Sequence, residues 1–233
     1  IGAAFGTVVN SLVTDVLIRT QEEDAGKPAS HHDFGKDIIP ALIGHGRTYA
    51  YPFYDENKKA AKYWRDIGTI DAYYEAQMDL CQVNPEFNMY DPEWPLRTYM
   101  PQAPPAKFVF AEDARRGEAR DSLVSQGCIV SGSRIYGSIL CPNVRVHSFC
   151  TVEDSILMPG VRVGRHARIR KAIIDRDVDI PRGALIGFNP EEDKRRHTVS
   201  EQGVVVVAPG DEPYVTPINE AALKLEIEAD RRG

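Results

Sequence analysis

Long apolar runs and metal-type cysteine spacings are both missing from this sequence. The longest apolar runs, such as Val204 to Ala208, are far shorter than the roughly 20 residues that a membrane-spanning helix needs. No basic segment followed by an apolar core opens the chain, so no signal peptide is expected. The four cysteines lack a CxxC or Cys/His arrangement, which favours reduced thiols in the cytoplasm over a disulfide framework.

An excess of positive charge is missing as well. The 28 Lys and Arg residues are outnumbered by 34 Asp and Glu residues, and the formal net charge is -6. This balance argues against a general binder of nucleic acid or of membrane surfaces. What is present is a chain of 233 residues, 42% hydrophobic and 27% charged, which is the composition of an ordinary globular protein with one or two domains.

The first third of the chain has a mixed α/β pattern. Thr14 to Glu23 fits a short surface helix, and "RTYAYPFY" at residues 47–54 alternates like a strand. Asp33 is a suitable N-cap for a second helix, which Pro40 should kink or shorten. A third helix is expected to open at Thr69.

Prolines then gather in one stretch between Cys81 and Lys107. Such a stretch has few backbone donors and restricted φ angles, so it favours an ordered or semi-rigid linker between two domains. It contains six of the sixteen prolines: Pro85, Pro92, Pro95, Pro101, Pro104 and Pro105.

Aliphatic residues next recur at a fixed spacing. Steps of six, six and five residues separate them, which gives a repeat of 17 residues. This spacing fits a triangular coil in which each of three short strands points one aliphatic residue inward and one corner is a residue shorter. It is the hexapeptide-repeat pattern of a parallel β-helix. The expected inward positions are Leu123, Ile129, Ile135, Leu140, Val146, Val152, Leu157, Val163, Ile169, Ile174, Ile180 and Ile186.

The chain beyond Gly187 becomes charged and then forms an apolar strand at Val204 to Val207. Ile218 to Arg232 fits a polar C-terminal helix that begins just after Pro217 and serves as a cap or a solvated tail.

Two carboxylate–aromatic pairs are candidates for binding. Trp64 and Asp66 precede the third helix, and Asp33 and Phe34 begin the second. A carboxylate can ligate Mg²⁺ or accept hydrogen bonds from sugar hydroxyls, and an aromatic ring can lie against the apolar face of a sugar. The structural alternative is that Asp66 pairs with Arg65 or caps the helix that follows.

Basic residues in the repeats are a second candidate site. Residues one repeat apart are stacked in a solenoid, so these side chains could form an anion-binding stripe in which guanidinium groups match phosphate geometry. The alternative is a solvated face balanced by Asp175, Asp177 and Asp179. The basic residues are Arg162, Arg165, His166, Arg168, Arg170, Lys171, Arg176 and Arg182.

Three histidines leave a different activity open, because hexapeptide β-helices also serve as acyltransferases with a histidine base. His147, His166 and His197 occupy no recognisable catalytic spacing, and a lone histidine in a repeat is more often an outward polar residue. They also lack the closely spaced pair that a zinc hydratase of this architecture would need.

Long strings of the sequence resemble bacterial glucose-1-phosphate adenylyltransferases (ADP-glucose pyrophosphorylases). The resemblance runs from about Thr14 to Val207. It rests, in order, on "SHHDFGKDIIP", "YWRDIGTIDAYYEAQMDL", "NMYDPEWPLRT", "PPAKFV", "SLVSQGCIVSGSRI", "VHSFCTVEDSILMPGVRVGRHARIRKAIIDRDVDIPRGALIG" and "NPEEDKRR".

The resemblance implies a fold and an activity. The fold is an α/β remnant of a Rossmann-like nucleotidyltransferase domain followed by a left-handed parallel β-helix. The activity converts ATP and glucose 1-phosphate to ADP-glucose and pyrophosphate with Mg²⁺, in a cytoplasmic homotetramer of glycogen synthesis that responds to AMP or sugar-phosphate effectors. The expected divisions are residues 1–80 (nucleotidyltransferase part), 81–116 (linker), 117–207 (β-helix) and 208–233 (tail or helix).

The resemblance also assigns roles to residues. Asp33, Phe34 and Trp64 match positions of the glucose 1-phosphate pocket. Asp66 matches the aspartate that helps to hold Mg²⁺, which makes it the catalytic candidate. Arg176, in "IIDRD", matches an arginine of the allosteric effector site.

The departures from the family concern the two ends. The family's glycine-rich nucleotide loop, its first metal aspartate and its Glu-Lys pair would lie upstream of Ile1, and residues 1–13 do not match the expected strand. We therefore expect this chain by itself to be an incomplete catalyst. Past Val207 the chain lacks the arginines that several relatives use for a sugar-bisphosphate activator, which leaves the activator open. The alternatives are a hexapeptide-repeat acyltransferase and a non-catalytic regulatory or oligomerisation module.

Overall fold

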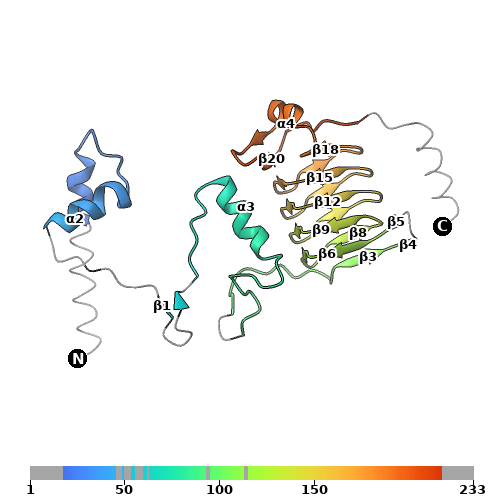
Figure 1. Cartoon of the computed structure of the whole chain (residues 1–233), viewed down its shortest axis with the longest axis horizontal. Coiled ribbons are helices and arrows are strands. Elements are labelled where there is room, and N and C mark those ends of the chain that lie inside the picture. Colours follow the sequence, from blue (N-terminus) through green and yellow to red (C-terminus); the bar gives the residue numbers. More distant parts are fainter. Residues whose placement is uncertain are drawn as a thin grey trace. The chain divides into compact units, whose positions relative to one another are not determined.

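The computed structural model describes residues 18–45, 49, 54–55, 60–61, 63–92, 95–112 and 115–216 (Figure 1). The chain divides into two compact units, Ile1–Lys62 and Tyr63–Gly233, and each is described by itself. In the part of the chain that the structure describes, no helix combines the length and the apolar character needed to cross a membrane.

The first unit is mainly helical where it is described. Residues 18–25 are helical, and after a loop the π-helix η1 (Phe34–Ile38) leads directly into α2 (Ile39–His45). Asp33 is the N-cap, as predicted, but the following segment is not one kinked α-helix. Because Pro40 has no N–H to donate to a carbonyl one turn earlier, regular α-type hydrogen bonding is interrupted there and the preceding turn is wider.

Several predictions fall wholly or partly on residues outside the described ranges. These are the C-terminal helix at residues 218–232, the mismatch at residues 1–13, the first four residues of the helix at residues 14–23 and most of the strand at residues 47–54. In the described part of this region, β1 (Tyr54–Asp55) pairs antiparallel with β2 (Ala60–Ala61).

The second unit contains a solenoid of parallel strands, which confirms the predicted β-helix (Figure 1). Strands of successive coils pair in register and form three sheets that run along the solenoid. Sheet 1 contains β7 (Leu123–Val124), β10 (Ile139–Leu140), β13 (Ile156–Leu157), β16 (Ala172–Ile174), β20 (Val205–Val207) and, antiparallel to β20, β19 (Thr198–Val199).

The other two sheets are built in the same way. Sheet 2 contains β3 (Lys107–Val109), β8 (Ile129–Ser131), β11 (Arg145–Val146), β14 (Arg162–Val163) and β17 (Asp179–Ile180). Sheet 3 contains β6 (Glu118–Arg120), β9 (Arg134–Tyr136), β12 (Thr151–Glu153), β15 (Arg168–Arg170) and β18 (Leu185–Ile186). A short antiparallel pair, β4 (Ala111–Glu112) with β5 (Arg115–Arg116), lies beside the first coil.

The core of the solenoid is the column of inward aliphatic side chains. The predicted inward positions from Ile135 to Ile186 are all at most 3% exposed. The first two predicted positions are wrong, because Val124 and Val130 occupy the inward register and Leu123 and Ile129 face outward. Each of these two sites holds a pair of adjacent aliphatic residues, Leu123-Val124 and Ile129-Val130. Because the first coil is one residue shorter than the later coils, a constant spacing selects the wrong member of each pair.

The corners of the solenoid use left-handed backbone. In one coil the three corner residues Asn143, Phe149 and Asp154 have φ angles of 64°, 66° and 45°. The next coil repeats this pattern 17 residues later. Left-handed backbone is unfavourable for most L-residues, so the stacking of coils, rather than local preference, holds Phe149 in this conformation.

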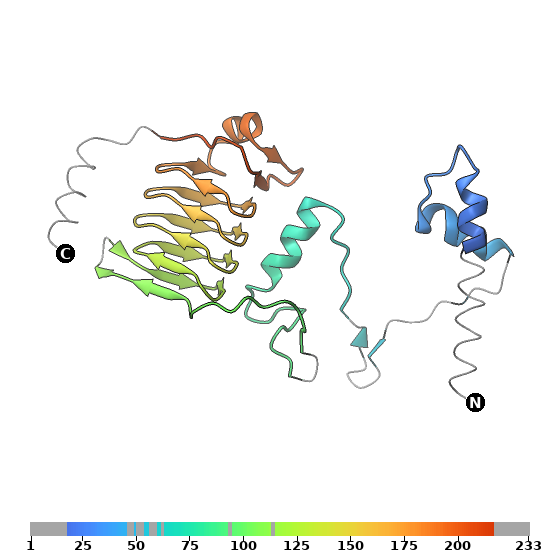
Figure 2. The same cartoon turned by 180° about the vertical axis from the view of Figure 1, so that it is seen from behind.

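The helix α3 (Ile70–Asp79) lies along sheet 1 in both views (Figures 1 and 2). Thr69 caps it, as predicted, by accepting a hydrogen bond from the N–H of Ala72 at 3.1 Å. Tyr74 of α3 packs against the outward side chains of sheet 1, which are almost fully buried. Sheet 1 is therefore apolar on both faces, and the outward set is Ile139, Ile156 and Ile173.

The solenoid includes residues beyond the predicted limits of 117 and 207. Lys107–Val109 already pairs with β8 inside the predicted linker. At the far end, α4 (Pro190–Arg196) precedes β19, and the N–H of Leu185 donates to the carbonyl of Tyr214 at 2.8 Å. Part of the predicted tail therefore runs beside the last coil.

Candidate functional site

Asp33 and Phe34 lie together at the start of η1 in the first unit. Oδ1 of Asp33 accepts hydrogen bonds from the N–H groups of Gly35 and Lys36, each at 2.8 Å. These two bonds, the one from Lys36 first, hold the pKa of Asp33 below its usual range, so the side chain is a carboxylate. The Phe34 ring is 49% exposed. Asp33 thus has a structural role as an N-cap, and Phe34 leaves a ring face accessible to a ligand.

A small cavity of about 190 Å³ adjoins Phe34, and sequence reasoning missed its polar residues. Oδ2 of buried Asp24 accepts a hydrogen bond from Oγ of Ser30 at 2.7 Å and lies 3.0 Å from Nδ1 of His32. The hydrogen bonds from Ser30 and then His32 lower the pKa of Asp24. The φ angle of His32 is 56°, a left-handed conformation that no sequence pattern announced.

Trp64 and Asp66 lie in the loop that leads into α3, in the second unit. Trp64 is 76% exposed, and Asp66 is also exposed. Oδ1 of Asp66 accepts a hydrogen bond from the N–H of Gly68 at 3.0 Å, while Oδ2 makes no hydrogen bond among the described residues. Arg65 pairs with Glu75 at 3.0 Å rather than with Asp66, and Thr69 rather than Asp66 caps α3. Asp66 therefore presents an oxygen that folding does not use.

The two candidate pairs belong to different compact units. The two members of each pair lie close together because they are neighbours in the sequence. No group of three potential metal ligands from His, Cys, Asp or Glu occurs among the described residues. Asp66 could thus contribute one carboxylate to a Mg²⁺ ion whose other ligands are phosphate oxygens and water, which is a common arrangement for Mg²⁺.

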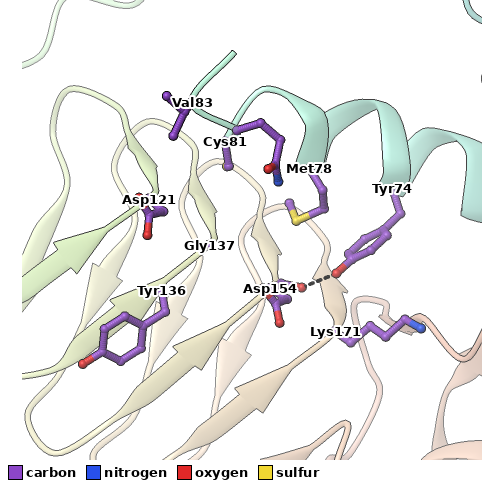
Figure 3. Close-up of a pocket in the computed structure, with 10 residues that line it drawn as sticks. Tyr74, Met78, Cys81, Val83, Asp121, Tyr136, Gly137, Asp154 and Lys171 are labelled. Carbon is purple, nitrogen blue, oxygen red and sulfur yellow. Dashed lines mark hydrogen bonds between the residues drawn. The ribbon is translucent and has the colours of Figure 1, made fainter. Parts of the chain in front are cut away.

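A groove of about 730 Å³ lies between α3 and one corner of the solenoid (Figure 3). Met78, Cys81 and Val83 line one side of it, and the corner residues Asp121 and Asp154 line the other. Burial raises the pKa of the Cys81 thiol, so this group is a poor nucleophile. The groove offers an apolar wall and carboxylates but no activated catalytic group.

A single hydrogen bond fixes one side of this groove. The hydroxyl of Tyr74 donates to the backbone carbonyl of Asp154 at 2.6 Å (Figure 3). Burial raises the pKa of Tyr74 to about 12, so the hydroxyl remains a donor throughout the neutral range. A sequence signal for this corner is the recurrence of Asp121, Gly137 and Asp154 at intervals of 16 and 17 residues.

The predicted basic residues do not form one stripe. Arg162 extends from sheet 2 and pairs with Asp179 of the next coil at 2.9 Å. Arg168 and Arg170 extend from sheet 3 and lie over the ring of Phe188, with their guanidinium carbons 4.5 and 4.4 Å from its centroid. The solvated alternative, balanced by acidic residues, is thus realised at Arg162.

Arg176 occupies an exposed corner turn between β16 and β17. Its backbone N–H donates to Oδ1 of Asp175 at 2.6 Å, which orders the turn. The side chain is exposed to solvent. This placement is suited to contact with an anionic ligand.

The three histidines have separate surroundings. The His166 ring stacks on Phe149 with centroids 5.0 Å apart. His197 is buried, and its Nδ1 lies 3.0 Å from Oδ2 of Asp211. Burial lowers the pKa of His147.

Comparison with known proteins gives two family matches. The model described as nucleotidyl transferase matches residues 11–83, and the model described as GlmU-like, C-terminal hexapeptide matches residues 104–207. The first match ends just after α3, although α3 packs on the solenoid.

Curated relatives extend the similarity over most of the chain. The glucose-1-phosphate adenylyltransferase of Koribacter versatilis is 52% identical over 205 residues, which cover 88% of this chain and 49% of the relative. The enzyme of the same name from Methylococcus capsulatus is 51% identical over 84% of this chain and 46% of its own length. That from Hydrogenovibrio crunogenus is 49% identical over 89% of this chain and 49% of its own length. The chain spans about half the length of the curated relatives it matches.

Proposed function

We propose that this chain is part of a glucose-1-phosphate adenylyltransferase, contributing one wall of the sugar-phosphate site and the hexapeptide β-helix. The observation that carries the proposal is the similarity to proteins of that name over most of the chain. The nucleotidyl transferase match, which includes both carboxylate–aromatic pairs, favours this activity over a β-helix acyltransferase.

The reaction would join the phosphate of glucose 1-phosphate to the α-phosphorus of ATP and release pyrophosphate. Such phosphoryl-type transfer depends mainly on positioning and on neutralisation of charge. The exposed rings of Trp64 and Phe34 are candidate surfaces for the apolar face of a sugar, and the Asp33 carboxylate is a candidate acceptor for sugar hydroxyls.

Mg²⁺ would neutralise phosphate charge in this scheme, and Asp66 is the residue of this chain that would hold it. Its exposed carboxylate keeps Oδ2 available while Oδ1 bonds the N–H of Gly68. That local bond fixes the orientation of the carboxylate before a cation arrives, which reduces the entropy lost on binding.

We further propose an effector site, an assembly and a cellular role. Arg176 would contact an AMP or sugar-phosphate effector, because its exposed guanidinium group can pair with phosphate. The protein would be a cytoplasmic homotetramer that acts in glycogen synthesis.

Replacement of Asp66 in the complete protein tests the proposal. With ATP, glucose 1-phosphate and Mg²⁺, the parent should release pyrophosphate, and Asp66→Asn should lower kcat/KM by about a hundredfold or more through loss of a metal ligand. Glu191→Gln, an exposed acid in the first turn of α4, is the control and should retain parent activity. A parent protein that binds effectors without making ADP-glucose would instead identify a regulatory module.

A further inference from the structure

We propose that the turn of the β19–β20 hairpin, residues 200–204, positions the Trp64–Asp66 loop through Gln202, Glu75 and Arg65. This inference rests on the proposed function, since it gives these three residues a positioning role for the candidate sugar-phosphate and Mg²⁺ site. None of them is expected to touch the substrate.

The loop itself has little apolar support. Trp64, its largest side chain, is 76% exposed and so contributes little burial to hold it in place. The one hydrogen bond of the Asp66 side chain to a described residue is from the local N–H of Gly68. The contact that joins the loop to the body of α3 is the ion pair between Nη2 of Arg65 and Oε2 of Glu75, at 3.0 Å.

Glu75 is shared between the loop and the solenoid. Its other oxygen, Oε1, accepts a hydrogen bond from Nε2 of Gln202 at 3.0 Å. Accepting from both sides fixes the carboxylate plane, and this in turn fixes the direction from which Arg65 approaches. A glutamate on an exposed helix face without the second partner would sample several rotamers.

The backbone of Gln202 is held at both its N–H and its carbonyl. Its backbone N–H donates to Oδ2 of Asp71 at 3.3 Å, and its carbonyl accepts from Nζ of Lys171 at 2.7 Å. The hydroxyl of Ser200 also donates to Oδ1 of Asp71. The tip of the hairpin is thus hydrogen-bonded to the first two turns of α3. It is also hydrogen-bonded to a solenoid corner, since Lys171 is a corner residue with φ of 48°.

The β19–β20 hairpin belongs to the last coil and lies in sheet 1. The strand β20 pairs in parallel with β16 over three residues, so the hairpin extends the stack of coils. Arg176 follows β16 by two residues. A rearrangement of the last coil would therefore change the position of the loop through hydrogen bonds and an ion pair. The apolar packing of α3 on sheet 1 would not have to be broken.

Kinetics of the complete protein test the positioning role. Glu75→Ala should raise the KM for glucose 1-phosphate about two- to fivefold and leave kcat within about twofold, because an exposed ion pair contributes only modestly. Gln77→Ala, which makes the same change in helix propensity on α3 without touching Arg65 or Gln202, should keep the parent KM. The double variant Arg65→Glu with Glu75→Arg restores an ion pair and should recover most of the loss.

Amide hydrogen exchange of residues 63–69, measured on this chain, provides a readout that does not depend on activity. Glu75→Ala should speed exchange in this segment about two- to fivefold, Gln202→Ala should have a smaller effect in the same direction, and Gln77→Ala should have none. Unchanged exchange in both Glu75→Ala and Gln202→Ala would overturn the inference, and so would an active parent whose KM is unaffected by Glu75→Ala. An inactive parent with the expected exchange pattern would overturn the proposed activity and leave the positioning role standing.

Discussion

Individual residues at the solenoid corners adopt backbone conformations that their side chains do not prefer. Phe149, His166 and Lys171 all have φ angles between 48° and 66°. The cost of about 1 kcal/mol or more at each is offset because the corner lets both flanking strands join the stacked sheets. A corner glycine that lies close to the backbone of a neighbouring coil cannot be replaced at this cost, because a side chain would clash with that backbone.

Gly187 and Gly203 form a matched pair for testing this point. Both have left-handed φ angles, 78° and 82°, but a Cβ at Gly187 would lie 1.8 Å from the carbonyl oxygen of Arg170, whereas a Cβ at Gly203 would meet nothing within 4 Å. Gly203→Ala should lower the free energy of unfolding by about 1 kcal/mol, and Gly187→Ala by about 3 kcal/mol or more. Denaturant unfolding measures both, and equal losses would contradict the role given to the close approach.

At the scale of elements, the most informative contact is α3 against sheet 1. The helix lies within the nucleotidyl transferase match, yet its apolar side chains complete the outer face of the solenoid. The sequence feature that indicates this packing is the adjacent aliphatic pairs of sheet 1, such as Ile139-Leu140 and Ile156-Leu157. One member points inward, and the other is buried only because a further element covers it.

Removal of the Tyr74 hydroxyl tests how firmly α3 is docked. Tyr74→Phe loses the hydrogen bond to the carbonyl of Asp154 and should lower the free energy of unfolding by about 1 kcal/mol. Tyr73→Phe is the matched control, because the half-buried neighbour makes no hydrogen bond through its hydroxyl among the described residues, and it should change stability by less than about 0.5 kcal/mol. Equal effects in chemical unfolding would assign the loss to ring packing instead.

At the scale of the whole molecule, the second unit is built from repeats that contact mainly their neighbours. Each coil presents the same inward column to the coils on either side. Stability of such a stack is approximately a sum over coils and the interfaces between them. Loss of one complete coil should therefore preserve the fold.

Deletion of residues 144–160 tests this modularity, since it removes one 17-residue period and joins Asn143 to the equivalent of its normal neighbour, Val161. The shortened chain should remain folded, with a lower Tm and cooperative unfolding by circular dichroism. Deletion of residues 144–155 removes only part of a coil and joins the corner residue Asn143 directly to Ile156 of β13, in sheet 1. This variant should lose cooperative unfolding, and a Tm equal to that of the first deletion would contradict the model of stacked periods.

The sequence by itself determined the β-helix, most of its inward column, the caps at Asp33 and Thr69, and the similarity that supports the proposed activity. These features are local or periodic, so spacing and residue type are sufficient to identify them. The choice between Leu123 and Val124, the π-helix before Pro40 and the local hydrogen bond of Asp66 needed more than spacing. Only the tertiary structure decided that α3 belongs with the solenoid and that Gln202 reaches Glu75, 127 residues away in sequence. The physical reason is that such contacts depend on which surfaces the folded coils leave open, and a one-dimensional pattern does not contain that information.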